Sequence, residues 1–281
     1  MGVESTPAQS PSPSRAGRNL PAAIAVGVGL GALILGSLYW QKVLFVFLVL
    51  ATVLLAVDEM IKALRTGGAV IPKIPLFAGT AGMLLAAYFG GPMALLVAMA
   101  ATVLGTIIWR MPDGSIGFVR DASAGVFLIG YVPLLAGFAI LLVQPEADGP
   151  ARVVTFFLVT VASDVGGYAA GTLFGKHPMA PTISPKKSWE GFAGSTLACI
   201  GAGIGSVVWL LDGNWWVGVI VGAVAVVTAT VGDLGESMIK RDLGIKDMSN
   251  LLPGHGGVMD RLDSLLATAP AVWLVLQLFV K

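Results

Sequence analysis

Long apolar segments separated by short polar ones are the feature that most limits how this chain can fold. The 281-residue sequence is 56% hydrophobic and only 12% charged, whereas soluble domains carry about 25% charged residues. A membrane-spanning helix needs about 20 consecutive, mostly apolar residues. The sequence therefore predicts an all-α, polytopic membrane protein.

We expect about nine transmembrane helices, because nine apolar segments approach this length. They cover residues 20–38, 42–57, 74–90, 92–109, 123–143, 153–175, 191–211, 214–232 and 264–280. The second helix is expected to continue past Asp58 toward Leu64. Tight turns are expected at 90–92 (Gly-Gly-Pro) and 212–214 (Asp-Gly-Asn).

The polar segments divide the chain into three parts. Residues 1–19 are rich in Pro and Ser and predict a disordered tail. Residues 20–143 form an N-terminal transmembrane region. Residues 144–281 form a C-terminal transmembrane region, in which we place the catalytic function, with polar loops at 176–190 and 233–263.

The distribution of lysine and arginine predicts the orientation. Of the 17 lysines and arginines, only Lys42, Arg152 and Lys281 fall on one side of the membrane in this arrangement. Short loops rich in these residues face the cytoplasm. We therefore expect a cytoplasmic N-terminus and a multi-pass protein of the cell (inner or plasma) membrane, with both polar loops on the cytoplasmic face. The net charge of +1 gives no indication of nucleic-acid binding.

The segment from Gly232 to Asp263 gathers acidic residues beside two apolar segments. Asp233, Glu236 and Ser237 have the i, i+3, i+4 spacing of one helix face, and Asp260 and Asp263 are also three residues apart. Oxygen ligands of this kind suit Mg²⁺. We predict Asp233 and Asp260 as its leading ligands and Glu236, Ser237 and Asp263 as supporting ones, and leave a second cation open.

Cations and glycines in the same region suit phosphate binding. Lys240, Arg241, Lys246 and Arg261 can neutralise phosphate charge, and Gly256 and Gly257 allow the backbone to approach a ligand closely. We expect His255 between them to contact phosphate or order the loop, with a role as general base not required. A solvated loop with mixed salt bridges is the alternative.

Two further elements carry polar residues toward the cytoplasmic side. Asp164 lies deep in the sixth span, where a carboxylate usually faces a polar cavity; pairing with an interior cation is the alternative. Lys186 and Lys187 precede Ser188, an expected N-cap, and form a phosphate-attracting helix start. The alternative is the ordinary enrichment of lysine and arginine beside the cytoplasmic end of a membrane span.

The motifs of the C-terminal half resemble those of phosphatidate cytidylyltransferases (CDP-diacylglycerol synthases). The resemblance rests on Ser237-x-x-Lys240-Arg241-x4-Lys246-Asp247, on Pro253-x-His255-Gly256-Gly257-x-x-Asp260-Arg261-x-Asp263, and on the segment 184–191 (Ser-Pro-Lys-Lys-Ser-Trp-Glu-Gly). It covers about residues 160–265. The family usually has threonine where Ser188 stands.

The resemblance implies an enzyme that converts CTP and phosphatidate to CDP-diacylglycerol and pyrophosphate at the bilayer surface, and it suggests a homodimer. Carried onto this sequence, the catalytic candidates are Asp233, Asp260, Asp263, Lys240, Arg241 and His255. The substrate-binding candidates are Asp164, Lys186, Lys187, Lys246, Gly256, Gly257 and Arg261.

Two other functions compete with this interpretation. A CTP-dependent lipid kinase of the dolichol or phytol type shares nucleotide use and a similar Ser-Pro loop, but lacks the long motif around His255 and Asp260. A transporter of a phosphorylated solute would need polar residues along a pore toward both faces. Here the polar residues gather at one face.

Overall fold

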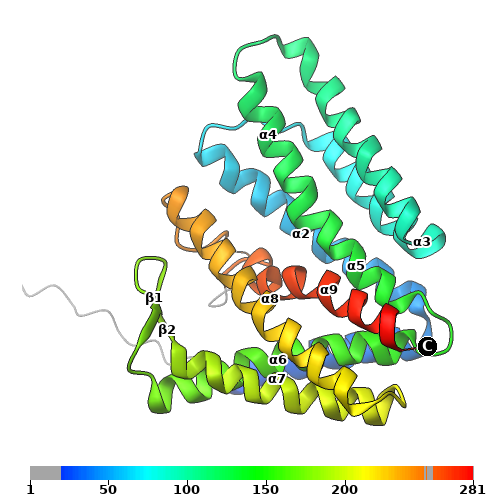
Figure 1. The fold of residues 1–281 in the computed structure, drawn as a ribbon. Coiled ribbons are helices and arrows are strands. Elements are labelled where there is room, and N and C mark those ends of the chain that lie inside the picture. Colours follow the sequence, from blue (N-terminus) through cyan, green and yellow to red (C-terminus); the bar gives the residue numbers. More distant parts are fainter. Residues whose placement is uncertain (1–19, 250, 252–255, 281) are drawn as a thin grey trace, which may run out of the picture.

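The computed structural model describes residues 20–249, 251 and 256–280, and most of them are helical (Figure 1). The helices are α1 (Leu20–Trp40), α2 (Lys42–Thr66), α3 (Lys73–Arg110), α4 (Phe118–Ile129), α5 (Leu135–Val143), α6 (Gly149–Phe174), α7 (Trp189–Leu210), α8 (Trp215–Asp242) and α9 (Met259–Phe279). A 3-10 turn, η1 (Met111–Asp113), follows α3, and a π-helical stretch, η2 (Gly130–Leu134), joins α4 to α5. The two strands are β1 (Pro178–Ala180) and β2 (Ser184–Ser188).

The apolar segments form membrane-length helices, as expected. Within the residues just given, seven helical segments are long and apolar enough to cross a membrane, with α3 counted as one and α4 to α5 as one. The described apolar part of α1, Gly31–Trp40, is shorter than a span. The count of nine therefore stays a prediction. The continuation of α2 beyond Asp58 is confirmed.

Helix α3 folds back on itself as a helical hairpin. Gly91 has φ 72° and ψ −164°, far from helical values, and Pro92 opens the second arm, where a missing amide hydrogen costs little. Gly79 packs against Thr102, although these positions would lie about 35 Å apart in a straight helix. The expected spans 74–90 and 92–109 are thus the two arms, with the turn in the predicted place.

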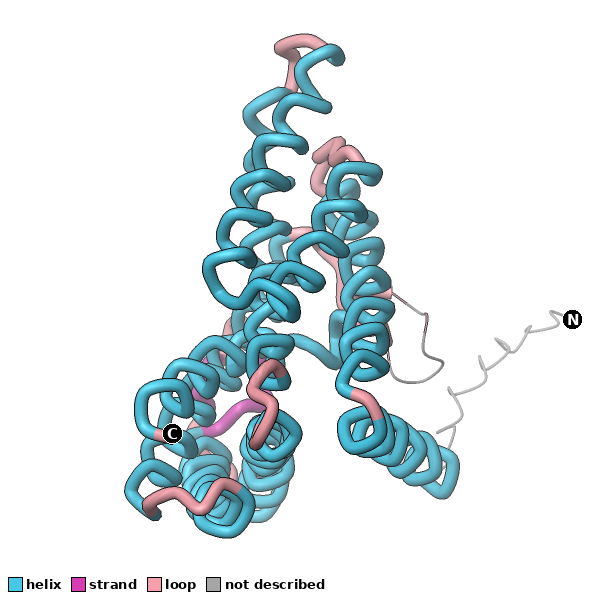
Figure 2. The backbone as a smooth tube through the Cα atoms, turned by 90° about the vertical axis from the view of Figure 1, so that its right-hand side faces the viewer, coloured by secondary structure: helices cyan, strands magenta, loops and turns pink. Residues whose placement is uncertain are grey.

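The second arm of α3 and helix α4 form a projection from the rest of the molecule (Figures 1 and 2). This arm and α4 rise together, and the 111–117 connection lies at the far end of the projection that they form. The more polar C-terminal helices lie at the other end of the molecule.

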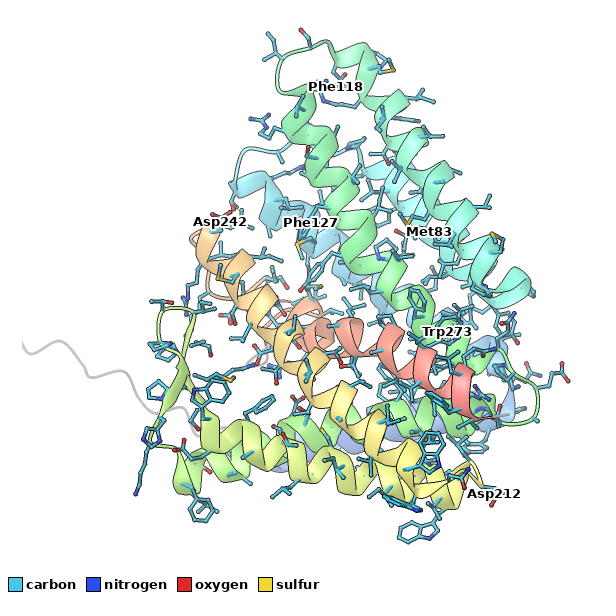
Figure 3. All side chains as sticks on the ribbon, viewed as in Figure 1. Met83, Phe118, Phe127, Asp212, Asp242 and Trp273 are labelled. Atoms are coloured by element: carbon cyan, nitrogen blue, oxygen red, sulfur yellow. The ribbon has the colours of Figure 1, made fainter. Side chains whose placement is uncertain are left out.

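Helices α6, α7, α8 and α9 pack as successive neighbours. Glycines allow this close approach, because a Cβ atom at Gly203 or Gly222 would collide with the backbone of the facing helix. Small residues at such contacts are the usual basis of helix packing in lipid. Asp212, in the turn between α7 and α8, and Asp242, at the end of α8, lie at opposite ends of this pair (Figure 3).

The expectation of an all-α protein is wrong in the loop 176–190. Strands β1 and β2 pair antiparallel there, with Pro178 opposite Ser188 and Ala180 opposite Ser184. The residue before a proline is disfavoured in helical conformation, so Pro185 keeps Ser184 extended, and strand pairing then satisfies the backbone hydrogen-bonding groups.

Two predicted helix boundaries are also wrong. Helix α8 continues beyond residue 232 to Asp242, and α9 begins at Met259 rather than 264. The extension of α8 is favoured by the i, i+4 ion pair between Glu236 and Lys240. It places Asp233, Glu236 and Lys240 on one helix, as the spacing of the acids indicated, and shortens the expected loop 233–263.

Candidate active site

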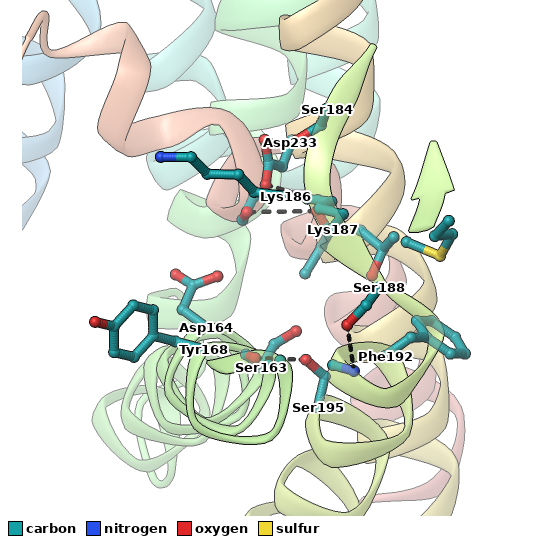
Figure 4. Close-up of a pocket in the computed structure, with 17 residues that line it drawn as sticks. Ser163, Asp164, Tyr168, Ser184, Lys186, Lys187, Ser188, Phe192, Ser195 and Asp233 are labelled. Carbon is teal, nitrogen blue, oxygen red and sulfur yellow. Dashed lines mark hydrogen bonds and ion pairs between the residues drawn. The ribbon is translucent and has the colours of Figure 1, made fainter. Parts of the chain in front are cut away.

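A polar pocket of about 300 Å³ lies where α6, β2, the start of α7 and α8 meet. Its lining includes Asp164 of α6, Lys186 and Lys187 of β2, and Asp233 of α8 (Figure 4). These residues come from the three polar elements that the sequence singled out. The structure therefore brings all three together around one cavity.

The pocket wall is fixed by short contacts between α6 and α7. Ser188 caps α7, since its Oγ accepts a hydrogen bond of 3.1 Å from the amide of Gly191, as predicted. Ser195 Oγ donates a 2.6 Å hydrogen bond to the Ser163 carbonyl, and Gly191 packs on α6. The end of β2 is thereby held beside Asp164.

An ion pair crosses the pocket from β2 to α8. Lys187 Nζ lies 2.6 Å from Asp233 Oδ2 (Figure 4), and both side chains are partly exposed. A lysine in this position presents a charge to the cavity. A phosphate entering the pocket would compete with Asp233 for Lys187.

A second charged cluster lies farther along α8. Lys240 Nζ is 2.8 Å from Asp260 Oδ1 and 3.1 Å from Glu236 Oε1. Asp260 Oδ2 also accepts hydrogen bonds from the amides of Met248 (3.0 Å) and Gly257 (2.7 Å). Asp260 therefore balances the charge of Lys240 and fixes both ends of the 248–257 segment.

The sequence interpretation missed Glu59, an acidic residue of α2 that belongs to this region. Glu59 is 3% exposed. Its Oε1 accepts hydrogen bonds from Ser249 Oγ (2.5 Å) and the Val258 amide (3.0 Å), and its Oε2 accepts one from the Met259 amide (2.8 Å). A carboxylate at a helix N-terminus is stabilising, so Glu59 of the N-terminal region caps α9.

The predicted magnesium ligands lie on facing parts of α8 and α9. Glu236 is completely buried, and Lys240 Nζ lies 3.1 Å from its Oε1. Ser237 Oγ lies 3.4 Å from Asp233 Oδ1, and Asp263 Oδ1 accepts from the Ser264 amide. Among residues 20–249, 251 and 256–280, no three carboxylate, histidine or cysteine side chains form a preassembled metal site.

The glycines of the predicted loop allow close approach to carboxylates of the protein itself. Gly256 has φ +79°, and a Cβ atom there would meet Asp260, while one at Gly257 would meet Glu59. Arg241, Lys246 and Arg261 are exposed. His255 lies outside the described residues.

Comparison with known proteins decides which family these features belong to. The profile of the cytidylyltransferase family matches residues 21–279. The chain belongs to this cytidylyltransferase family.

Individual cytidylyltransferases are similar over most of the chain. The phosphatidate cytidylyltransferase of Mycobacterium leprae is 46% identical over 280 residues, covering 94% of this chain and 89% of that protein. That of Mycobacterium tuberculosis (strain H37Rv) is 45% identical and covers 94% of this chain and 84% of that protein. That of Pseudomonas aeruginosa is 38% identical and covers 69% of this chain and 74% of that protein. The resemblance thus extends through the N-terminal helices, beyond residues 160–265. This extension includes α2, which supplies Glu59.

Proposed function

We propose that this nucleotidyltransferase converts CTP and phosphatidate to CDP-diacylglycerol and pyrophosphate. The observation that carries the proposal is the 46% identity to a phosphatidate cytidylyltransferase over 94% of the chain. The pocket that joins Asp164, Lys187 and Asp233 supports it, because the cavity combines cations for phosphate with polar walls.

In the proposed reaction a phosphate oxygen of phosphatidate attacks the α-phosphorus of CTP. The new P–O bond forms as the bond from that phosphorus to the bridging oxygen breaks, and pyrophosphate leaves with the electron pair. The attacking group is already anionic, so the step requires no protein nucleophile. The contribution of the protein is positioning and charge stabilisation. Lys187 and Lys186 would hold phosphates at the pocket, and Lys240 would act from the neighbouring cluster.

The residues present fit the magnesium ion that the family resemblance implies. Glu236 offers two buried oxygens, of which Oε1 faces Lys240 and Oε2 has no hydrogen-bond donor among the described residues. Asp233, Asp260 and Asp263 lie on the same two helices. Mg²⁺ is usually held by one or two carboxylates together with substrate phosphates, so a preassembled set of three is not required. When bound, it would neutralise phosphate charge.

We predict that activity requires a divalent cation. Exhaustive treatment of the purified protein with EDTA should abolish CDP-diacylglycerol synthesis, and excess Mg²⁺ should restore it, because an all-oxygen donor set favours this ion. The rate of product formation before and after Mg²⁺ addition is the measurement. Full activity after EDTA treatment would refute the metal requirement.

Lys187 offers a test of the pocket. Lys187→Ala should lower kcat/KM for CTP by about 10- to 100-fold, since a charged hydrogen-bond donor to phosphate is lost. Lys176→Ala, an exposed lysine just before the β-hairpin, is the matched control and should stay near the wild-type value. Equal kinetics for the two variants would exclude Lys187 from CTP binding.

We further propose that the pocket faces the cytoplasm, where CTP is found, in a homodimer of the cell membrane. The lysine and arginine distribution supports this orientation. Asp212 and Asp242 lie at opposite ends of the α7–α8 pair (Figure 3), so they would face opposite sides of the membrane.

Cysteine labelling tests the orientation, after Cys199, the single cysteine of the sequence, has been replaced by alanine. Cysteine at Asn214, an exposed residue at the start of α8, should react with a membrane-impermeant maleimide in intact cells. Cysteine at Asp247 should react only after permeabilisation. Labelling of position 247 in intact cells would reverse the orientation.

The test of the proposed function uses CTP labelled at either the α- or the γ-phosphate. With phosphatidate and Mg²⁺, α-label should enter the lipid product and γ-label should leave in pyrophosphate. Transfer of the γ-label to a polyprenol or another lipid alcohol would instead identify a CTP-dependent lipid kinase.

A further inference from the structure

A second cavity, almost entirely apolar, lies beside the candidate active site. It has a volume of about 330 Å³ and is lined by residues of α1, α2, α5, α6 and α9. Its walls include Phe45, Val49, Ala139, Phe157 and Leu265. Arg261 is the charged residue among its described lining residues. The volume is at the lower end of the range for small-molecule sites.

The apolar cavity and the polar pocket share two helices. On α6, Phe156 and Phe157 line the apolar cavity, whereas Ser163 and Asp164 line the polar pocket. These pairs are separated by about 10 Å of helix. On α9, Arg261 and Leu265 line the apolar cavity, whereas Ser264 lines the polar pocket. A ligand in one cavity is therefore close to a ligand in the other.

We infer that the apolar cavity receives an acyl chain of the lipid substrate, with the head-group phosphate at Arg261. This inference rests on the proposed function. Charge complementarity identifies the occupant, because a guanidinium beside an apolar cavity fits a phosphate carrying a hydrocarbon chain. Lipid tails are as apolar as the cavity walls, so the cavity contributes mainly by orienting the chain. The phosphate is thereby directed along α9 toward the polar pocket.

Filling the cavity tests the inference. Ala139 lines it from α5, and Ala139→Trp should raise the apparent KM for dioleoyl phosphatidate in detergent micelles by about tenfold or more, since overpacking excludes the chain. The KM for CTP should not change, and dihexanoyl phosphatidate should be affected less than about twofold, because its short chains do not need the cavity. Ala51→Trp, at an exposed position of α2 outside the cavity lining, is the matched control and should behave as wild type.

The outcomes separate this inference from the proposed function. Wild-type protein that makes no CDP-diacylglycerol would refute the proposed function. If wild type is active, equal kinetics for Ala139→Trp and Ala51→Trp, or equal losses with long and short chains, would overturn the acyl-chain site.

Photo-crosslinking of wild-type protein provides a result that does not depend on the folding of a variant. Phosphatidate with a diazirine in the middle of one chain should label cavity residues such as Val49, Phe157 and Leu265. Crosslinks confined to exposed positions such as Leu158 and Ala51 would overturn the inference.

Discussion

Asp260→Asn is expected to lower CDP-diacylglycerol synthesis by about 10²-fold or more, because a small misplacement of catalytic groups has an effect of this size. Asp260 contacts Lys240 through one oxygen and the amides of Met248 and Gly257 through the other. An asparagine would place its amide group against a donor in either orientation. Lys240 would lose one of its two neighbouring carboxylates in both orientations. In the orientation that keeps the oxygen toward Lys240, the 248–257 segment would also lose its hydrogen bonds at both ends.

Initial rates with saturating CTP and phosphatidate measure this effect, with far-ultraviolet circular dichroism as the check of folding. Asp242→Asn, at the exposed end of α8, is the matched control and should retain wild-type activity. An Asp260→Asn variant that keeps more than about a tenth of the rate, a barrier change below ~1.4 kcal/mol, would contradict the assigned role.

Glu59→Gln is expected to lower kcat by about 10- to 100-fold and the thermal unfolding midpoint by about 5 °C. Glu59 accepts three hydrogen bonds in a buried position. A glutamine would turn its amide group toward at least one donor, and the start of α9 would lose its capping charge. Asp260 and Arg261 lie in this first turn, so their positions would be disturbed.

Hydrogen exchange separates this effect from general destabilisation. Protection at Val258 and Met259 should fall in Glu59→Gln while protection in α7 is kept. Asp58→Asn, which removes the neighbouring carboxylate that pairs with the more exposed Lys62 and Lys73, should leave activity within about twofold, because ion pairs near the surface contribute little. Unchanged protection and activity in Glu59→Gln would show that α9 does not need this cap.

The sequence predicted the helices and the helical placement of the candidate acids because both depend on local patterns. Apolar segments of membrane length determine the helices, and Gly91 with Pro92 determines the turn of α3. The spacing of Asp233 and Glu236 required a helix, which α8 provides. The sequence indicated that Asp164, Lys187 and Asp233 each lie in a polar element of an apolar protein, and the structure shows that these elements meet at one cavity.

The remaining features depend on contacts between distant parts of the chain. Glu59 bonds residues about 200 positions away, and nothing near it in the sequence marks that partner. The bonds from Asp260 to Met248 and Gly257 likewise arise from the path of the connecting segment. The β-hairpin at 178–188 is too short to show an alternating pattern, and its pairing becomes evident only when α6 and α7 bring its ends together.

The central claim is that the pocket between Asp164, Lys187 and Asp233 holds the reacting nucleotide. Its most direct test is an experimental structure of the protein with α,β-methylene-CTP, which the proposed reaction cannot cleave, and Mg²⁺. We predict density for the triphosphate in this pocket, with a phosphate oxygen bonded to Lys187 and the Lys187–Asp233 ion pair opened. Nucleotide bound elsewhere, with that ion pair intact, would contradict the claim.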